Sequence, residues 1–176
     1  MKESRTETCH LFTDDEIVRF AEQARPRIIG MDAPLSLPRG RTSIHERNDK
    51  HLRECDRELT RNKIRFFPVT LGPMRKLPER GMALKGAFEE IGIDAFEIYP
   101  GGAQDIYEIP RKQKGMDLLL SGLRELGIAG LNSEMSDHEL DAATGAFVLQ
   151  SFLAGKARAW GNPDEGLIVM PDPIHP

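Results

Sequence analysis

Residues 27–32 read Arg-Ile-Ile-Gly-Met-Asp, an apolar run that ends on a carboxylate two residues before Pro34. A short apolar run followed by a proline is typical of a buried β-strand. Upstream, Thr13-Asp-Asp-Glu16 fits a capping box that begins a helix, and Pro26 ends that helix. Residues 6–12 suit a short strand before the helix. A strand, a helix and a second strand in this order predict an α/β sheet.

The rest of the chain continues this alternation within a length of 176 residues, which suits one domain. We expect helices over residues 51–61, 77–91, 116–126 and 136–154, and strands over residues 95–99 and 166–170. The chain is long enough to bury a hydrophobic core without disulfides or a structural metal. The sequence therefore predicts a single α/β domain over residues 1–176.

The composition excludes several classes of protein. Charged residues make up 30% of the chain and hydrophobic residues 39%, which is unlike a disordered or collagen-like protein. No apolar stretch approaches the ~18 residues that cross a membrane, and the first residues lack the apolar core of a secretory signal. Cys9 and Cys55 are therefore expected to be reduced thiols. We expect a cytoplasmic protein without a membrane segment.

Positive charge is concentrated in one part of the chain. The formal net charge is −4, but the segment from Arg39 to Lys85 holds 13 basic and 6 acidic residues. A basic segment on an acidic protein can contact phosphates, and the part from Arg39 to Arg65 would then bind a nucleic-acid backbone. The alternative is a solvated helix face with charges of both signs. The sequence leaves both interpretations open.

Two acids lie on predicted strands. Asp32 stands at the carboxyl end of its strand, where open α/β sheets bind ligands, but an Asp before Ala-Pro can equally cap the following turn. Glu97 alternates with Phe96 and Ile98, so its side chain either faces solvent or contributes to a site at the strand end. Both alternatives stay open for each acid.

A third acidic group begins the predicted helix over residues 136–154. Ser136 and Glu139 fit a second capping box, and Asp137 complements the helix dipole. Neither role explains His138 and Asp141. Asp141 shares one helix face with His138, three positions before it, and one with Asp137, four positions before it. The small residues that follow would let this helix lie close to a sheet. Oxygen ligands with a histidine on a packed helix suit a hard divalent cation such as Mg²⁺ or Mn²⁺.

Five short motifs together resemble a known family. They are Gly30-Met-Asp-Ala-Pro-Leu-Ser-Leu-Pro38, Arg53-Glu-Cys-Asp-Arg57, Glu97-Ile-Tyr-Pro100, Asp137-His-Glu-Leu-Asp-Ala142 and Gly161-Asn-Pro-Asp-Glu-Gly-Leu-Ile-Val169. In this order and spacing they are similar to the domain-of-unknown-function 429 family, from Thr13 onward. That family is described as predicted nucleases with an RNase H-like fold. The resemblance implies an RNase H-like mixed sheet flanked by helices.

The resemblance also implies a hydrolase, namely a nuclease that depends on a divalent metal. In RNase H-like nucleases, acids from the first strand, a later strand and the last helix hold two metal ions, which activate a water and stabilise the leaving oxygen. Asp32 would match the later strand acid, and His138 and Asp141 resemble the helix pair. The expected catalytic residues are Asp32, His138, Asp141 and Glu97. The expected ligands for Mg²⁺ or Mn²⁺ are Asp32, Asp137 and Asp141.

The chain departs from the family pattern at its start. The pattern begins with a strand that carries a Gly-x-Asp motif, whereas residues 1–12 contain no Asp. We therefore expect a sheet that lacks its first strand or strands. Three explanations are open: the true start lies upstream of Met1, a partner chain (a homodimer included) supplies the strand, or the fold persists without catalysis. The alternatives to a nuclease are an inactive binding or assembly module and a hydrolase of small phosphate esters.

Overall fold

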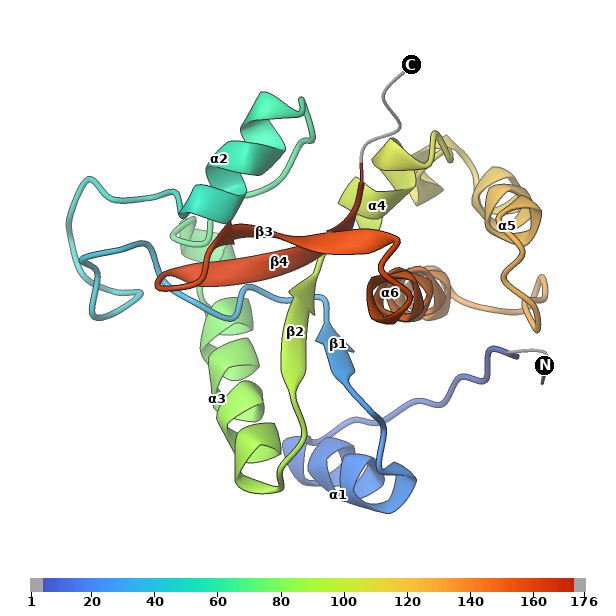
Figure 1. Cartoon of the computed structure of the whole chain (residues 1–176), viewed down its shortest axis with the longest axis horizontal. Coiled ribbons are helices and arrows are strands. Elements are labelled where there is room, and N and C mark those ends of the chain that lie inside the picture. The colour runs from blue at the N-terminus through green and yellow to red at the C-terminus, as the bar shows by residue number, and fades with distance from the viewer. Residues whose placement is uncertain (1–4, 173–176) are drawn as a thin grey trace.

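A computed structural model of the chain describes residues 5–172 and shows a four-stranded mixed sheet flanked by helices (Figure 1). The strands are β1 (Ile29–Met31), β2 (Ala95–Ile98), β3 (Ala157–Asn162) and β4 (Gly166–Pro171). Their order across the sheet is β1-β2-β4-β3. Strands β1, β2 and β4 run parallel, and β3 pairs antiparallel with β4. The predicted α/β class is confirmed.

Helices pack on both faces of the sheet. They are α1 (Asp14–Ala24), α2 (Glu54–Arg61), α3 (Lys76–Glu90), α4 (Pro100–Ile106), α5 (Met116–Glu125) and α6 (Asp137–Leu153). Helices α1 and α3 cover one face, α6 lies against the other, and α2 lies beside the β3–β4 hairpin (Figure 1). Over the described residues, no helix has the length and apolar character that spanning a membrane requires.

Successive side chains along each strand pack alternately against the helices on the two faces of the sheet. Ile29 and Met31 of β1 pack with Phe88 of α3. Ile98 of β2 packs with Val148 of α6, on the opposite face. Successive side chains of a strand point to opposite faces, so this packing assigns each strand residue to one of the two layers. By the same alternation, the side chains of Asp32 and Glu97 point to opposite faces of the sheet.

The predicted helix boundaries agree with the structure to within three residues. Both capping boxes are confirmed: the Glu16 N–H donates to Thr13 Oγ1 at 3.2 Å, and the Glu139 N–H donates to Ser136 Oγ at 3.3 Å. The strand expected over residues 6–12 is wrong, since that segment joins no strand of the sheet. Helix α4 and strand β3 have no counterpart among the predictions. The sequence of α4 begins Pro-Gly-Gly, which resembles a turn.

Glycine brings α6 close to the sheet. A Cβ added at Gly145 of α6 would overlap the Ile98 side chain of β2, and one added at Gly30 of β1 would lie 2.7 Å from Leu149 Cδ1. Real Cβ atoms do not come this close, so a side chain at either position would have to displace the end of the Ile98 or the Leu149 side chain. Asp141 lies one helical turn before Gly145, and the close packing therefore holds it near the strand ends.

Candidate functional site

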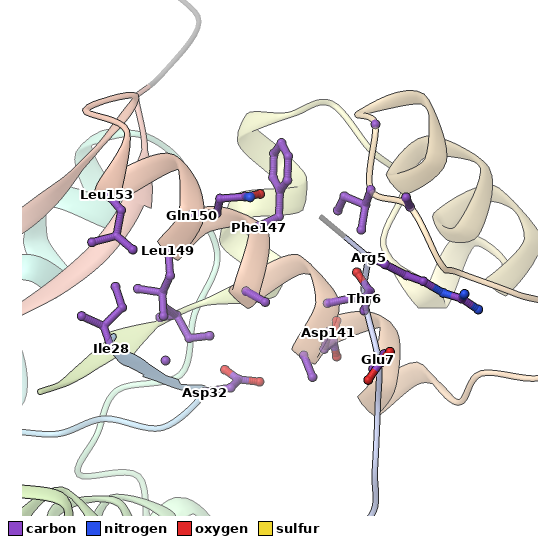
Figure 2. Close-up of a pocket in the computed structure, with 18 of the residues that line it drawn as sticks. Arg5, Thr6, Glu7, Ile28, Asp32, Asp141, Phe147, Leu149, Gln150 and Leu153 are labelled. Atoms are coloured by element: carbon purple, nitrogen blue, oxygen red, sulfur yellow. The ribbon is translucent and has the colours of Figure 1, made fainter. Parts of the chain in front are cut away.

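A cavity of about 770 Å³ lies along the outer edge of β1 (Figure 2). The Ile29 N–H donates to the Asp94 carbonyl oxygen at 2.9 Å, on the β2 side. Alternate residues of a parallel strand point their backbone groups to opposite sides, so those of Ile28, Gly30 and Asp32 face the cavity. All three residues line it. Helix α6 and the extended N-terminal segment form other walls.

The Asp32 carboxylate enters this cavity from the carboxyl end of β1 (Figure 2). It stays open to water, but the surrounding protein removes part of its hydration and the charge of Asp141 repels it. These two effects raise the pKa of Asp32 to about 6, against an opposing attraction from Lys112. The turn after β1 is held by another acid, because the Leu35 N–H donates to Glu97 Oε2 at 2.8 Å.

A lysine bridges the two acids in the first turns of α6. The Lys112 ammonium lies 2.7 Å from Asp137 Oδ2 and 3.1 Å from Asp141 Oδ2. On the other side, the buried Gln104 donates from Nε2 to Asp141 Oδ1 at 2.9 Å. Both oxygens of Asp141 are therefore oriented by donors. The hydrogen bond from Lys112 also lowers the pKa of Asp137 below its usual value.

His138 lies on the rim of the same cavity. Its side chain is 86% exposed, and its Nε2 is 4.0 Å from Asp137 Oδ1. The structure thus brings Asp32, His138 and Asp141 to one cavity, with Asp137 attached through Lys112. Between residues 5 and 172, however, no three His, Cys, Asp or Glu side chains gather closely enough to hold a metal together. The arrangement provides carboxylates that face one space, with an ammonium beside them.

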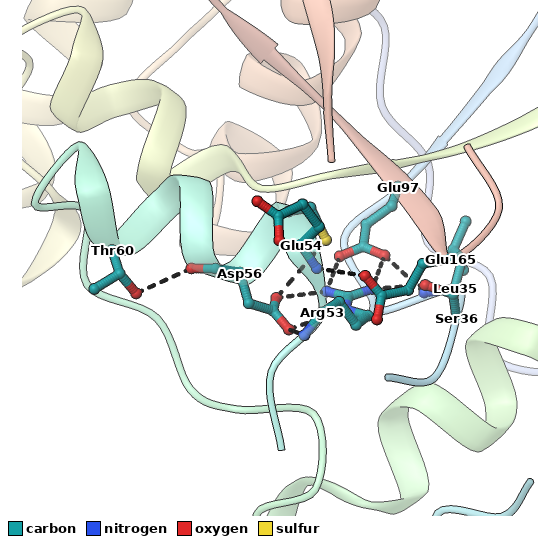
Figure 3. Close-up of polar contacts among 9 residues, drawn as sticks. Leu35, Ser36, Arg53, Glu54, Asp56, Thr60, Glu97 and Glu165 are labelled. Carbon is teal, nitrogen blue, oxygen red and sulfur yellow. Dashed lines mark hydrogen bonds and ion pairs between the residues drawn. The ribbon is translucent and has the colours of Figure 1, made fainter. Parts of the chain in front are cut away.

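Glu97 belongs to a different environment. It alternates with Phe96 and Ile98, which pack on the α6 side, so it projects from the opposite face to Asp32. Only 4% of it is exposed, and the alternative in which it faces solvent is therefore wrong. Arg53 donates to both of its oxygens, at 2.6 and 2.7 Å (Figure 3). Glu97 does not line the cavity that holds Asp32.

Several of the quoted motifs meet at this buried ion pair (Figure 3). Arg53 also donates to Asp56 at 2.9 Å and to the Ser36 hydroxyl at 3.1 Å. Glu165, from the last motif, accepts from the Glu54 N–H at 2.6 Å. We define Arg53, Asp56 and Glu97 as the buried ion network. It ties the loop after β1, the start of α2 and strand β2 together, which gives these motifs a structural role.

Most cations between Arg39 and Arg65 are satisfied within the protein. Arg41 donates to backbone carbonyls of its own loop. Arg57 and Arg61 both pair with Glu54. In the described part of the chain, the cations of this segment without a carboxylate within 4.0 Å are Arg41, Arg47, Lys50, Lys63 and Arg65, and of these Arg41 is satisfied by carbonyl oxygens. The expected contact with phosphates is therefore confined to few side chains.

Sequence reasoning missed Lys112 and Gln104. Gln104 lies in the short helix α4, which reads as a turn, and is 1% exposed in the structure. Lys112 lies in a basic stretch between helices, where nothing in the sequence distinguishes it from Lys114. Only the fold shows that these two side chains donate to Asp141.

No family model, curated protein or solved structure matches the chain.

Proposed function

We propose that this protein is a divalent-metal-dependent phosphodiester hydrolase with an RNase H-like fold, as in the domain-of-unknown-function 429 family. The observation that carries the proposal is the pair Asp32 and Asp141. They come from a strand end and from α6, line one cavity and repel each other electrostatically. A cation between them would relieve this repulsion, and Mg²⁺ and Mn²⁺ prefer carboxylate oxygens.

The position of β1 supports the RNase H-like part of the proposal. Strand β1 forms the parallel edge of the sheet, and its outer backbone groups face the cavity rather than another strand of the described chain. A further parallel strand can therefore add at this edge. The family pattern includes such a strand, with an acid, and that acid would then stand near Asp32.

The residues of the cavity have separate roles in this proposal. Asp32 and Asp141 would hold the cation, which when bound would activate a water and stabilise the leaving oxygen. Lys112 must release Asp141 Oδ2, while Gln104 keeps the other oxygen in place. His138 on the rim can carry a proton. Glu97 has no role, because Arg53 binds both of its oxygens.

The first test is a calorimetric titration with Mn²⁺ of the wild type, Asp141→Asn and Asp117→Asn. Asp117 is an exposed acid of α5 outside the cavity, so its variant controls for the loss of one charge. We expect saturable binding by the wild type and the control, and binding weaker by about tenfold or more for Asp141→Asn. Equal heats from the wild type and Asp141→Asn would reject the site.

The second test is cleavage of labelled single-stranded DNA, RNA and duplex DNA with Mg²⁺ or Mn²⁺. A chromogenic phosphodiester in the same assay covers hydrolysis of small phosphate esters. We expect Asp141→Asn to abolish cleavage and Asp117→Asn to retain it. If both variants cleave like the wild type, the activity does not come from this cavity.

A second candidate is a module that keeps the fold without catalysis. It is favoured by the finding that, within residues 5–172, no three potential ligands gather at one point. Such a module shows no saturable heat with Mn²⁺ and no cleavage of any substrate. The calorimetric titration therefore separates the two candidates before any substrate is known.

A further inference from the structure

A second cavity, of about 1410 Å³, opens on another part of the surface. One wall is the segment at residues 60–67, at and after the end of α2. The other wall is the segment at residues 105–114, which connects α4 to α5 and contains the short 3₁₀ helix Lys112–Lys114. We call this feature the basic groove. It lies outside the cavity lined by Asp32 and Asp141, which we call the acidic cavity, but Lys112 of its second wall contacts Asp141.

Unpaired positive charge dominates the basic groove. Lys63, Arg65 and Lys114 are exposed, and no carboxylate of the described residues lies within 4.0 Å of their charged groups. Arg111 is neutralised by Asp105, to which it donates at 2.8 Å. Glu108 is the one remaining acid of the lining. A local excess of cations on a chain of net charge −4 favours a polyanionic ligand.

An exposed aromatic ring lies among these cations. Phe67 is 69% exposed, which leaves its ring face available. The other aromatic side chains here are already engaged. Phe66 packs against the core. The Tyr99 hydroxyl donates to the Arg65 carbonyl oxygen at 2.6 Å, and the Arg111 guanidinium lies 5.5 Å from the Tyr99 ring centroid. These contacts fix the groove wall. Cations beside a free aromatic ring are the combination that binds single-stranded nucleic acid, since phosphates meet cations and bases stack on rings.

Short stretches of chain connect the basic groove to the acidic cavity. Arg111 lines the groove, and the next residue, Lys112, contacts Asp141. Tyr99, also in the groove, directly follows β2, and Asp32 directly follows the neighbouring strand β1. The two cavities share no lining residue.

We propose that the basic groove binds single-stranded nucleic acid, with phosphates at Lys63, Arg65 and Lys114 and a base stacked on Phe67. A duplex keeps its bases stacked inside, so it cannot offer a base face to the ring. The link between this binding and cleavage rests on the proposed function, but the binding itself does not.

The test is fluorescence anisotropy of labelled 12-nucleotide oligo(dT) and oligo(U), with a DNA duplex for comparison, all in EDTA. The absence of divalent metal separates binding from cleavage. The variants are Phe67→Ala and the double variant Lys63→Ala/Arg65→Ala. The double variant Arg19→Ala/Lys156→Ala is the matched control, because it removes two exposed cations that lie outside the groove and outside the segment from Arg39 to Arg65.

We expect Phe67→Ala to weaken binding of both single strands by about tenfold, the effect of losing one stacked base. Phe20→Ala, which removes an exposed ring of α1, should leave binding unchanged. The Lys63→Ala/Arg65→Ala variant should reduce the slope of log affinity against log salt by about 1.4, because each phosphate contact to a single strand contributes about 0.7. The Arg19→Ala/Lys156→Ala control should keep the wild-type slope.

The basic groove is the wrong site if the wild type binds no single strand at low salt, if the duplex binds as tightly, or if the control variants weaken binding as much as the groove variants. Metal-dependent cleavage that is insensitive to the groove variants would overturn this inference and leave the proposed function intact. The expected binding without any cleavage would support this inference while the proposed function fails.

Discussion

Two acids in neighbouring parts of the sheet, Glu97 on β2 and Asp32 directly after β1, lie in opposite environments. Glu97 of β2 is the register partner of Met31, and Asp32 is the next residue along from Met31. Glu97 is buried against Arg53, which contacts both of its oxygens. Asp32 faces a cavity, and the largest effects on its pKa are loss of hydration and repulsion from Asp141. One step along a strand therefore separates a structural ion pair from an unneutralised carboxylate.

The difference shows how to distinguish a structural acid from a functional one. A guanidinium that donates to both oxygens of a carboxylate satisfies its charge and its geometry together. An ionised carboxylate whose pKa is raised by loss of hydration and by a second carboxylate lowers the stability of the fold, and such strain is common at functional sites. The buried ion network should thus respond to mutation through stability. The acidic cavity should respond mainly through cation binding.

The largest expected effect is on the buried ion network. Arg53→Met removes the guanidinium and leaves Asp56 and Glu97 buried without their partner. Breaking a buried pair from one side costs about 3–5 kcal/mol of unfolding free energy, measured by urea denaturation. Arg57→Met is the control: its exposed pair with Glu54 should change stability by less than about 0.5 kcal/mol. Similar values for both variants would show that the network is not structural.

Glu97→Gln should have the next largest effect on the free energy of unfolding. The amide keeps the size of the side chain but loses its charge and turns N–H donors toward Arg53. We expect a loss of about 1.5–3 kcal/mol, the range for hydrogen bonds to charged groups, in the same denaturation experiment. If metal binding in the acidic cavity falls instead while stability is unchanged, Glu97 belongs to the site after all.

Asp32→Asn should change stability in the opposite direction. The folded pKa of about 6 lies above the ordinary value of 3.8, so ionisation of Asp32 destabilises the fold as the pH rises through this window. The variant should be more stable than the wild type by about 1 kcal/mol above pH 6, a figure that allows for solvent screening. The gain should vanish below pH 4. Thermal unfolding from pH 3.5 to 8 measures it, and a gain that does not vary with pH would contradict the assigned cause.

The sequence predicts more of the fold than of the site. Capping boxes at Thr13 and Ser136 and the apolar run before Asp32 are local patterns, and the structure reproduces each of them. Residues 6–12 suit a short strand, but a strand needs a neighbour, and the local sequence does not provide one. The same limit applies to Glu97, whose burial depends on an arginine 44 positions away.

The site shows this limit most clearly at Lys112. The sequence places Asp137 and Asp141 on one helix face, and the structure agrees. It gives no indication that an ammonium lies between their oxygens, because Lys112 reaches them from a loop before α5. Spacing along one helix is a local property. The charge that completes or blocks a cation site comes from elsewhere in the fold.

Lys112→Met gives the smallest expected effect and tests the comparison most directly. The ammonium occupies the oxygens of Asp137 and Asp141 that a divalent cation would use, so its removal should strengthen Mn²⁺ binding. Partly exposed ion pairs contribute less than about 1 kcal/mol, and the dissociation constant should therefore fall by about two- to fivefold in calorimetry. Lys114→Met, two residues away and without contact to these acids, is the control. If Lys112→Met instead weakens Mn²⁺ binding and lowers stability, the acids of α6 form a structural pair like Glu97 and Arg53, and the contrast between the two regions disappears.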